Sequence, residues 1–199
     1  LCPLTQATRD LTFKNLSTGA SIINLRSAPG NPATNNVIKN CNIEGNATSA
    51  TVFGIASTDQ TVTTSSLGKD NDNNSYINNA ISKVQFGIYS QGENRSNKNQ
   101  GTIIQLNNID LTSSANTAVA GIFLGFENNV QLSGNTIRNI SNSTRSVAGI
   151  VLGLLPSTNS NVFTGNDVTN SLISHNTVRD ISRIGDGSAF GISMAAVIS

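Results

Sequence analysis

Charged side chains are scarce in this chain, and their scarcity excludes whole classes of partner. Only 12% of its 199 residues are charged, and the formal net charge is +1. Such a surface has no field strong enough to attract nucleic acid or an anionic membrane. No run of about 18 apolar residues is present either, so we expect no membrane span.

Histidine and cysteine are also rare. His175 is the only histidine, and it has no cysteine or histidine partner nearby in the sequence, which argues against a metal or general-base role. The two cysteines, Cys2 and Cys41, match no zinc or redox spacing. They leave two alternatives open, a disulfide that pins the N-terminal segment or two small buried thiols.

No segment shows the apolar period of an amphipathic helix. Apolar residues instead fall into two short phrases that recur at variable intervals. The first places glycine between Phe or Ala and Ile, with its glycines at Gly54, Gly87, Gly121, Gly149 and Gly191. The second is a pair of apolar residues separated by four others: Ile38 and Ile43, Tyr76 and Ile81, Ile104 and Ile109, Leu132 and Ile137, and Ile173 and Val178.

Fixed phrases with elastic spacers are typical of a solenoid, whose turns stack on one another and whose insertions form loops. Alternation in the glycine strand places Ile122 and Leu124 inside and Gly121 and Phe123 outside. The sequence therefore predicts an all-β fold, a single-stranded parallel β-helix of about five to six coils. The crossover preference of parallel strands predicts that it is right-handed.

An asparagine recurs at the turn between the second and third strands of four coils, as Asn79, Asn107, Asn135 and Asn176. Asparagine tolerates the left-handed conformation of a sharp corner. Stacked amides can also bond along the solenoid axis and satisfy backbone groups. We therefore expect these four residues to form a structural asparagine ladder.

The chain also contains 29 Asn, 25 Ser and 20 Thr. Through the phrases at residues 35–46, 86–90 and 133–137, the chain resembles the pectin-lyase-like right-handed parallel β-helix superfamily over roughly residues 11–198. It looks most like the Asn/Thr-rich β-helix arrays of large secreted or surface bacterial proteins. The resemblance implies an extracellular or cell-surface location and a module within a longer chain. It implies no single activity, because the fold hosts enzymes, adhesins and passive stalks.

The outward positions of the glycine strand carry no Asp, Glu, Lys, Arg or His, so we predict no catalytic residues on that face. Tyr89 and Phe123 occupy equivalent outward positions on adjacent coils. They either stack on sugar rings or lie buried under neighbouring loops. The leading hypothesis is a non-catalytic structural, adhesive or glycan-contacting module.

The alternative is a carbohydrate-active enzyme, a polysaccharide lyase or glycoside hydrolase with its site among the long loops at residues 58–73, 91–100 and 156–168. A second outward column contains Glu44, Ser82, Asp110, Arg138 and Arg179. Glu44 and Asp110 would lie about 9.6 Å apart, near the upper limit for an inverting pair. The same column is also explained as an exposed ladder that pairs Asp110 with Arg138.

Residues 69–74 resemble the first half of a calcium loop, with Asp70, Asp72 and Asn74 as candidate ligands. Ser75 and Ile81 stand where glycine and glutamate are expected, so a polar turn before a strand is the alternative, and no other cofactor is expected.

The ends of the chain bear on its partners. The sequence begins without an initiator methionine or signal peptide, and residues 190–198 are apolar at alternate positions with no cap after them. We expect residues 1–199 to be one domain that is a fragment of a longer repeat-containing chain. The expected partners are glycans and neighbouring β-helix repeats, or a second copy in end-to-end self-association.

Overall fold

The structure is a computed structural model that describes residues 8–28, 30–59, 63–153 and 167–195. These residues contain 20 β-strands and no helix, which confirms the predicted all-β class. No helix in the described ranges is long and apolar enough to cross a membrane. The strands form four sheets, and all paired strands within them are parallel.

The four sheets are numbered 1 to 4. Sheet 1 contains β1 (Leu11–Lys14), β4 (Cys41–Glu44), β7 (Ala80–Ser82), β11 (Asn108–Asp110), β15 (Thr136–Asn142) and β19 (Thr177–Arg183). Sheet 2 contains β2 (Ser21–Arg26), β5 (Phe53–Thr58), β8 (Phe86–Gln91), β12 (Ala120–Gly125), β16 (Val147–Leu152) and β20 (Ala189–Met194). Sheet 3 contains β3 (Val37–Lys39), β6 (Ser75–Ile77), β10 (Ile103–Gln105), β14 (Gln131–Ser133) and β18 (Leu172–Ser174). Sheet 4 contains β9 (Asn99–Gln100), β13 (Glu127–Asn128) and β17 (Val168–Thr169).

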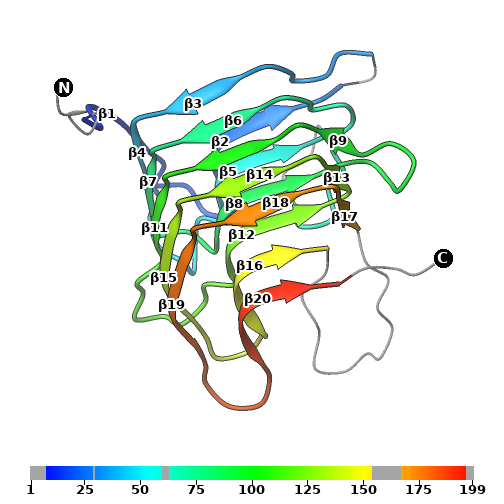
Figure 1. Cartoon of the computed structure of the whole chain (residues 1–199). Coiled ribbons are helices and arrows are strands. Elements are labelled where there is room, and N and C mark those ends of the chain that lie inside the picture. Colours follow the sequence, from blue (N-terminus) through cyan, green and yellow to red (C-terminus); the bar gives the residue numbers. More distant parts are fainter. Residues whose placement is uncertain (1–7, 29, 60–62, 154–166, 196–199) are drawn as a thin grey trace, which may run out of the picture.

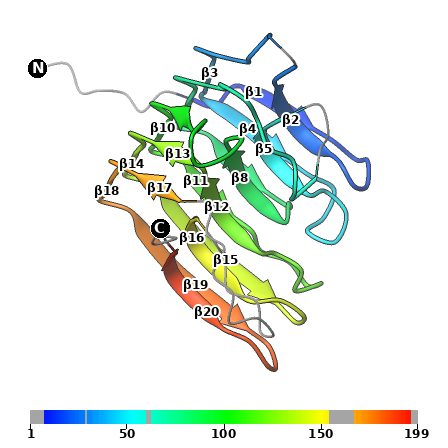
Figure 2. The same cartoon turned by 90° about the vertical axis from the view of Figure 1, so that its right-hand side faces the viewer.

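The chain visits the sheets in a fixed order. It passes from sheet 3 to sheet 1 to sheet 2 five times, and each such passage is called a repeat below. The last three repeats begin with a short strand of sheet 4, which the sequence did not predict. Figure 1 shows the repeats layered in sequence order. The turned view in Figure 2 places β1, β2 and β3 at one end of the stack and β18, β19 and β20 at the other.

The strand register aligns the recurring apolar residues. In sheet 1 one row contains Ile43, Ile81, Ile109, Ile137 and Val178. In sheet 2 one row contains Ile55, Ile88, Ile122, Ile150 and Ile192. The interior members of both rows are buried in one continuous hydrophobic cluster. Ile122 and Leu124 point into this cluster, as the alternation predicts.

The recurring glycine of sheet 2 is explained by close packing between repeats. A Cβ at Gly121 would lie 2.4 Å from Cγ2 of Ile137 and 2.8 Å from the carbonyl oxygen of Gly149, both in the next repeat. Separations under 3.0 Å force the neighbouring atoms to move. A Cβ at Gly121 would therefore point toward the core cluster that contains Ile137, so the expectation that Gly121 faces outward is wrong. Glycine lets one repeat pack directly against the next.

The outer face of sheet 2 is apolar as well. The second cluster consists of Phe53, Ala56, Phe86, Tyr89, Val119, Ala120, Ala148 and Val151, all buried. Sheet 2 is thus covered on both faces across its central strands. This double burial accounts for strands that are nearly continuously apolar, a pattern typical of buried parallel sheets.

Candidate functional site

A groove of about 400 Å³ crosses the outer face of sheet 1. Its middle is β7, where Ala80 and Ser82 have short side chains. Longer polar side chains of the flanking strands form its sides: Thr12, Asn42, Glu44, Asn108, Asp110 and Arg138. The contrast in side-chain length between β7 and its neighbours leaves the groove open.

The predicted outward column runs through this groove. The register aligns Glu44, Ser82, Asp110, Arg138 and Arg179 in one row, as the sequence predicted. Glu44 and Asp110 are separated by the single strand β7, which corresponds to about 9.6 Å between their backbones. The groove therefore presents two carboxylates across a floor of small residues.

Both carboxyl groups are held in the ionised form. Glu44 Oε1 lies 2.5 Å from Nζ of Lys83 and 3.4 Å from Nζ of Lys14. The hydrogen bond from Lys83 is the main reason that the pKa of Glu44 is lowered. Glu44 thus remains charged at neutral pH.

Asp110 is ionised for a different reason. Partial burial alone would raise its pKa, but hydrogen bonds outweigh burial and hold the pKa well below its usual range. Thr112 donates from Oγ1 at 2.6 Å, Asn139 from Nδ2 at 2.9 Å and Arg138 from Nε at 2.8 Å. A glycosidase acid must keep its proton near neutral pH. Neither carboxyl group of this groove meets that requirement.

Tyr89 and Phe123 do lie side by side, as predicted from their equivalent positions. Their rings are stacked with centroids 4.8 Å apart. Tyr89 is only 1% exposed, and its hydroxyl donates to the carbonyl oxygen of Thr64 at 2.8 Å. The loop that contains Thr64 therefore closes over Tyr89, and its ring offers no open platform for a sugar. Tyr89 belongs to the second apolar cluster, and Phe123 packs against it.

Two of the three candidate calcium ligands bond to backbone groups instead. Asn74 is buried; its Oδ1 accepts from the backbone N–H of Asn36 at 2.9 Å and its Nδ2 donates to Ala33 at 2.7 Å. Asp72 accepts from the backbone N–H of Gln100 at 2.7 Å, and Asp70 is exposed. The described residues contain no group of three or more His, Cys, Asp or Glu side chains that could hold a metal ion. Calcium binding at this turn stays a prediction that would require Asn74 and Asp72 to release backbone groups.

The four turn asparagines form a hydrogen-bonded row. Asn107 Oδ1 accepts from the backbone N–H of Asn79 at 2.9 Å, and Asn107 Nδ2 donates to the carbonyl oxygen of Tyr76 at 2.8 Å. Asn135 and Asn176 repeat both bonds one and two repeats further on. The side chains also bond to each other along the row. Each asparagine therefore satisfies backbone groups of the preceding repeat.

The left-handed backbone expected at the ladder asparagines lies one residue earlier in the chain. The left-handed backbone belongs to the residue just before each ladder position: Asn40, Asn78, Leu106, Gly134 and His175 have φ of 58°, 51°, 58°, 68° and 54°. Asparagine is retained at the ladder for its hydrogen bonds. Cys41, at the same position in the first repeat, is a buried free thiol, and Cys2 lies outside the described residues.

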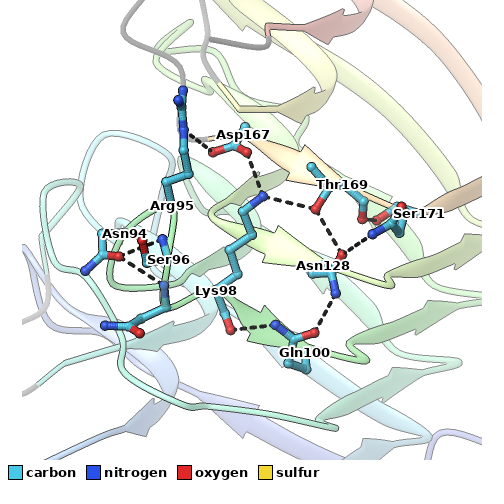
Figure 3. Close-up of polar contacts among 11 residues, drawn as sticks. Asn94, Arg95, Ser96, Lys98, Gln100, Asn128, Asp167, Thr169 and Ser171 are labelled. Atoms are coloured by element: carbon cyan, nitrogen blue, oxygen red, sulfur yellow. Dashed lines mark hydrogen bonds and ion pairs between the residues drawn. The ribbon is translucent and has the colours of Figure 1, made fainter. Parts of the chain in front are cut away.

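A second polar site, missed by the sequence analysis, lies along sheet 4 (Figure 3). Lys98 Nζ donates to Asp167 Oδ2 at 2.6 Å and to Thr169 Oγ1 at 3.0 Å. The side chains of Lys98 and Asp167 are only 11% and 12% exposed. From Thr169 a row of hydrogen bonds continues through Asn128 to Gln100. This network ties three successive repeats together, and the ammonium group is occupied by its acceptors.

Glu127 is the other residue that the sequence analysis missed. It is fully buried and accepts hydrogen bonds from Ser90 at 2.5 Å, Asn99 at 3.0 Å and Thr102 at 2.7 Å. Burial is the main reason that its pKa is raised. The one available signal was its spacing of 28 residues from Asn99, its register partner. Because Glu127 is enclosed, it is a structural rather than a catalytic carboxyl group.

Comparisons with known protein families, with curated proteins and with solved structures each found no match to this chain.

Proposed function

We propose that the five repeats, together with the preceding β1 and β2, form one right-handed parallel β-helix. Three observations support this architecture: the repeated order of visits to the sheets, the uniformly parallel pairing and the row of asparagines that crosses from repeat to repeat. Parallel strands joined through crossovers are right-handed in almost all known cases.

We further propose that this solenoid is a non-catalytic structural or adhesive module of an exported or cell-surface protein, and that it contacts a glycan through the groove of sheet 1. The groove carries the proposal. Its volume of about 400 Å³ falls within the range of small-ligand sites. Sugar hydroxyls can donate to the two carboxylates and accept from Arg138 and the amides. The strands hold these groups in fixed positions, which lowers the cost of binding.

Binding to polysaccharides tests the glycan contact. The chain is titrated with polygalacturonate as an acidic probe and with dextran and galactomannan as neutral probes, by calorimetry. We expect at least one probe to bind, and Asp110→Asn to weaken that binding about tenfold through loss of a charged acceptor. Asp180→Asn is the matched control, because Asp180 is an exposed carboxylate in β19 outside the groove. Absence of binding to every probe would remove the glycan contact from the proposal.

A carbohydrate-active enzyme is the second candidate, and the placement of Glu44 and Asp110 on either side of β7 is the observation that favours it. The same polysaccharides are incubated with the chain and assayed for new reducing ends and for unsaturated products. We expect no hydrolysis, because neither carboxyl group keeps a proton at neutral pH. We also expect no unsaturated products, and that assay tests elimination separately. Turnover that is abolished by Glu44→Gln or Asp110→Asn would overturn the non-catalytic proposal.

A further inference from the structure

Gly191 is the last of the five recurring glycines of sheet 2, and among the described residues it lacks the close contact with a following repeat that the other four make. At Gly54, Gly87, Gly121 and Gly149, a Cβ would lie within 2.8 Å of the next repeat. At Gly149, for example, it would lie 2.2 Å from Cγ1 of Val178. No described atom lies within 4 Å of a Cβ built on Gly191. Glycine in a strand interior usually marks a close approach of another backbone, and here that backbone is missing from the described chain.

The asparagine row leaves a second unused position at the same end. The backbone N–H groups of Cys41, Asn79, Asn107 and Asn135 each donate to the Oδ1 atom of the asparagine in the following repeat. The side chain of Asn176 ends the row, and among the described residues no asparagine follows it. The backbone N–H of Asn176 thus lies where the row would continue.

Apolar side chains are uncovered beside these two positions. Ile192 is 45% exposed and Met194 is 75% exposed, whereas their register partners Ile150 and Leu152 are 0% and 4% exposed. The same surface of β16 is covered by β20 itself. The end formed by β18, β19 and β20 is therefore the same surface that each repeat presents to the next.

We propose that this end docks one further coil of the same repeat type, with a turn sequence Asn-X-Ile or Asn-X-Val. The inference rests on the proposed solenoid and names its neighbour. In the four described interfaces an Ile or Val two residues after the ladder asparagine contacts the glycine of the preceding repeat: Ile81, Ile109, Ile137 and Val178. A coil with this turn supplies an acceptor for Asn176, a methyl group for Gly191 and apolar cover for Ile192.

A second copy of the chain is a poorer fit. Its exposed opposite end begins with β1, where Leu11 and Phe13 align with Cys41 and Ile43. That end offers no turn asparagine and no Ile or Val at the two required positions. Among the described residues, no sheet 3 strand lies beside β1 and β2, so β18 would find no described partner there.

An added repeat tests the proposal. A copy of residues 126–153 is joined directly after residue 195. Leu124 is the register partner of Leu152, and Leu152 is the register partner of Met194. Residue 195 therefore corresponds to residue 125, and the copy follows β20 in the way that β13 follows β12. We expect the melting temperature to rise and amide exchange at Asn176 to slow at least about tenfold. The control is the same extension with Ala in place of the copied Asn135. Unchanged exchange at Asn176 in the extended chain would overturn the proposal.

Glycine substitutions identify the contact itself. In the unextended chain we expect Gly191→Ala to leave the melting temperature unchanged and Gly149→Ala to lower it. In the extended chain both substitutions should lower it. A loss of stability from Gly191→Ala in the unextended chain would mean that Gly191 already packs against this chain, and the proposal would fail.

Two controls separate the possible failures. If Gly149→Ala is harmless in both chains, the stacking of repeats is wrong and the solenoid proposal fails. If Gly149→Ala destabilises but the added repeat does not dock, only the inference about the docked coil fails. Sedimentation of the unextended chain completes the test, since concentration-dependent association that protects Asn176 from exchange would assign this end to a second copy and overturn the proposal.

Discussion

Leu106 occupies a backbone position that suits leucine poorly. Its φ is 58° and its side chain is 60% exposed. The corresponding corners of the other repeats are occupied by Asn40, Asn78, Gly134 and His175. A left-handed conformation brings the Cβ of most residues too close to the backbone, and asparagine tolerates it better. We therefore expect Leu106→Asn to raise the free energy of unfolding by about 1 kcal/mol.

Urea denaturation measures the effect of Leu106→Asn. Leu172→Asn is the matched control, because Leu172 is 62% exposed but lies in strand β18 with no left-handed backbone. The control should give no gain. Equal stabilisation by both substitutions would show that removal of exposed leucine, rather than backbone strain, is responsible.

Glu127 makes the stability of the chain depend on pH. Its pKa is raised in the folded state, mainly by burial. Its contribution to stability is therefore fully present below the unfolded pKa, and it is lost as the pH rises through the folded pKa. The amide of a glutamine can accept hydrogen bonds from Ser90 and Asn99 and donate one to Thr102, and it does not titrate. We expect Glu127→Gln to become progressively more stable than the parent chain between acid and neutral pH.

Chemical denaturation across this pH range provides the measurement for Glu127→Gln. Glu93→Gln serves as the control, because Glu93 is a carboxyl group on an exposed loop. The stability of Glu93→Gln relative to the parent chain should not increase as the pH rises. A flat difference for Glu127→Gln would mean that Glu127 has the same pKa in the folded and unfolded chains.

At the scale of the elements, the asparagine row joins the turns between sheets 3 and 1. Asn107→Ala would leave the backbone N–H of Asn79 and the carbonyl oxygen of Tyr76 without their side-chain partner. Each unsatisfied buried group costs about 1–3 kcal/mol, so we expect a loss near 3 kcal/mol. The adjacent Asn108→Ala is the control, since no described residue donates a hydrogen bond to the buried Oδ1 of Asn108. Thermal unfolding that shows equal losses would contradict a specific role for the row.

The strands themselves were predictable from the sequence because their apolar residues recur. Ile122 and Leu124 could be placed inside from alternation alone. The burial of Tyr89 could not, because it depends on the loop at Thr64, which no period describes. Alternation assigns a side chain to one face of a strand, and it contains no information about what covers that face.

At the scale of the whole molecule, one repeat should be removable as a unit. Deletion of residues 99–126 joins Lys98 to Glu127 and puts β13, β14, β15 and β16 in the places of β9, β10, β11 and β12, their register partners. Each repeat in a solenoid contacts mainly its neighbours, so the shortened chain should still fold. We expect a β-rich circular dichroism spectrum and a cooperative, lower melting transition.

A shorter deletion is the control for the excised repeat. Removal of residues 106–119 alone eliminates β11 and one corner, which breaks the order of visits to the sheets. That chain should not melt cooperatively. If the 28-residue deletion also abolishes folding, the repeats are not interchangeable units and the solenoid proposal is weakened.

The groove was predictable in part. The row from Glu44 to Arg179 followed from aligning the repeats. The ionised state of Asp110 could not be predicted, because it depends on hydrogen bonds from Thr112 and Asn139 around one strand end. The contact between Lys98 and Asp167 joins residues 69 positions apart and lies between loops of unequal length. Loop residues have no periodic alignment, so such long-range pairs appear only in the folded chain.

The direction of the strands has a mechanical consequence. All of them run across the stack, so the backbone hydrogen bonds between repeats lie along it. A force that pulls the two ends of the stack apart loads these bonds in tension and peels one repeat at a time. A force along the strands loads many bonds in shear at once. The molecule should therefore extend at low force when it is pulled along the stack and resist higher force when it is pulled along the strands.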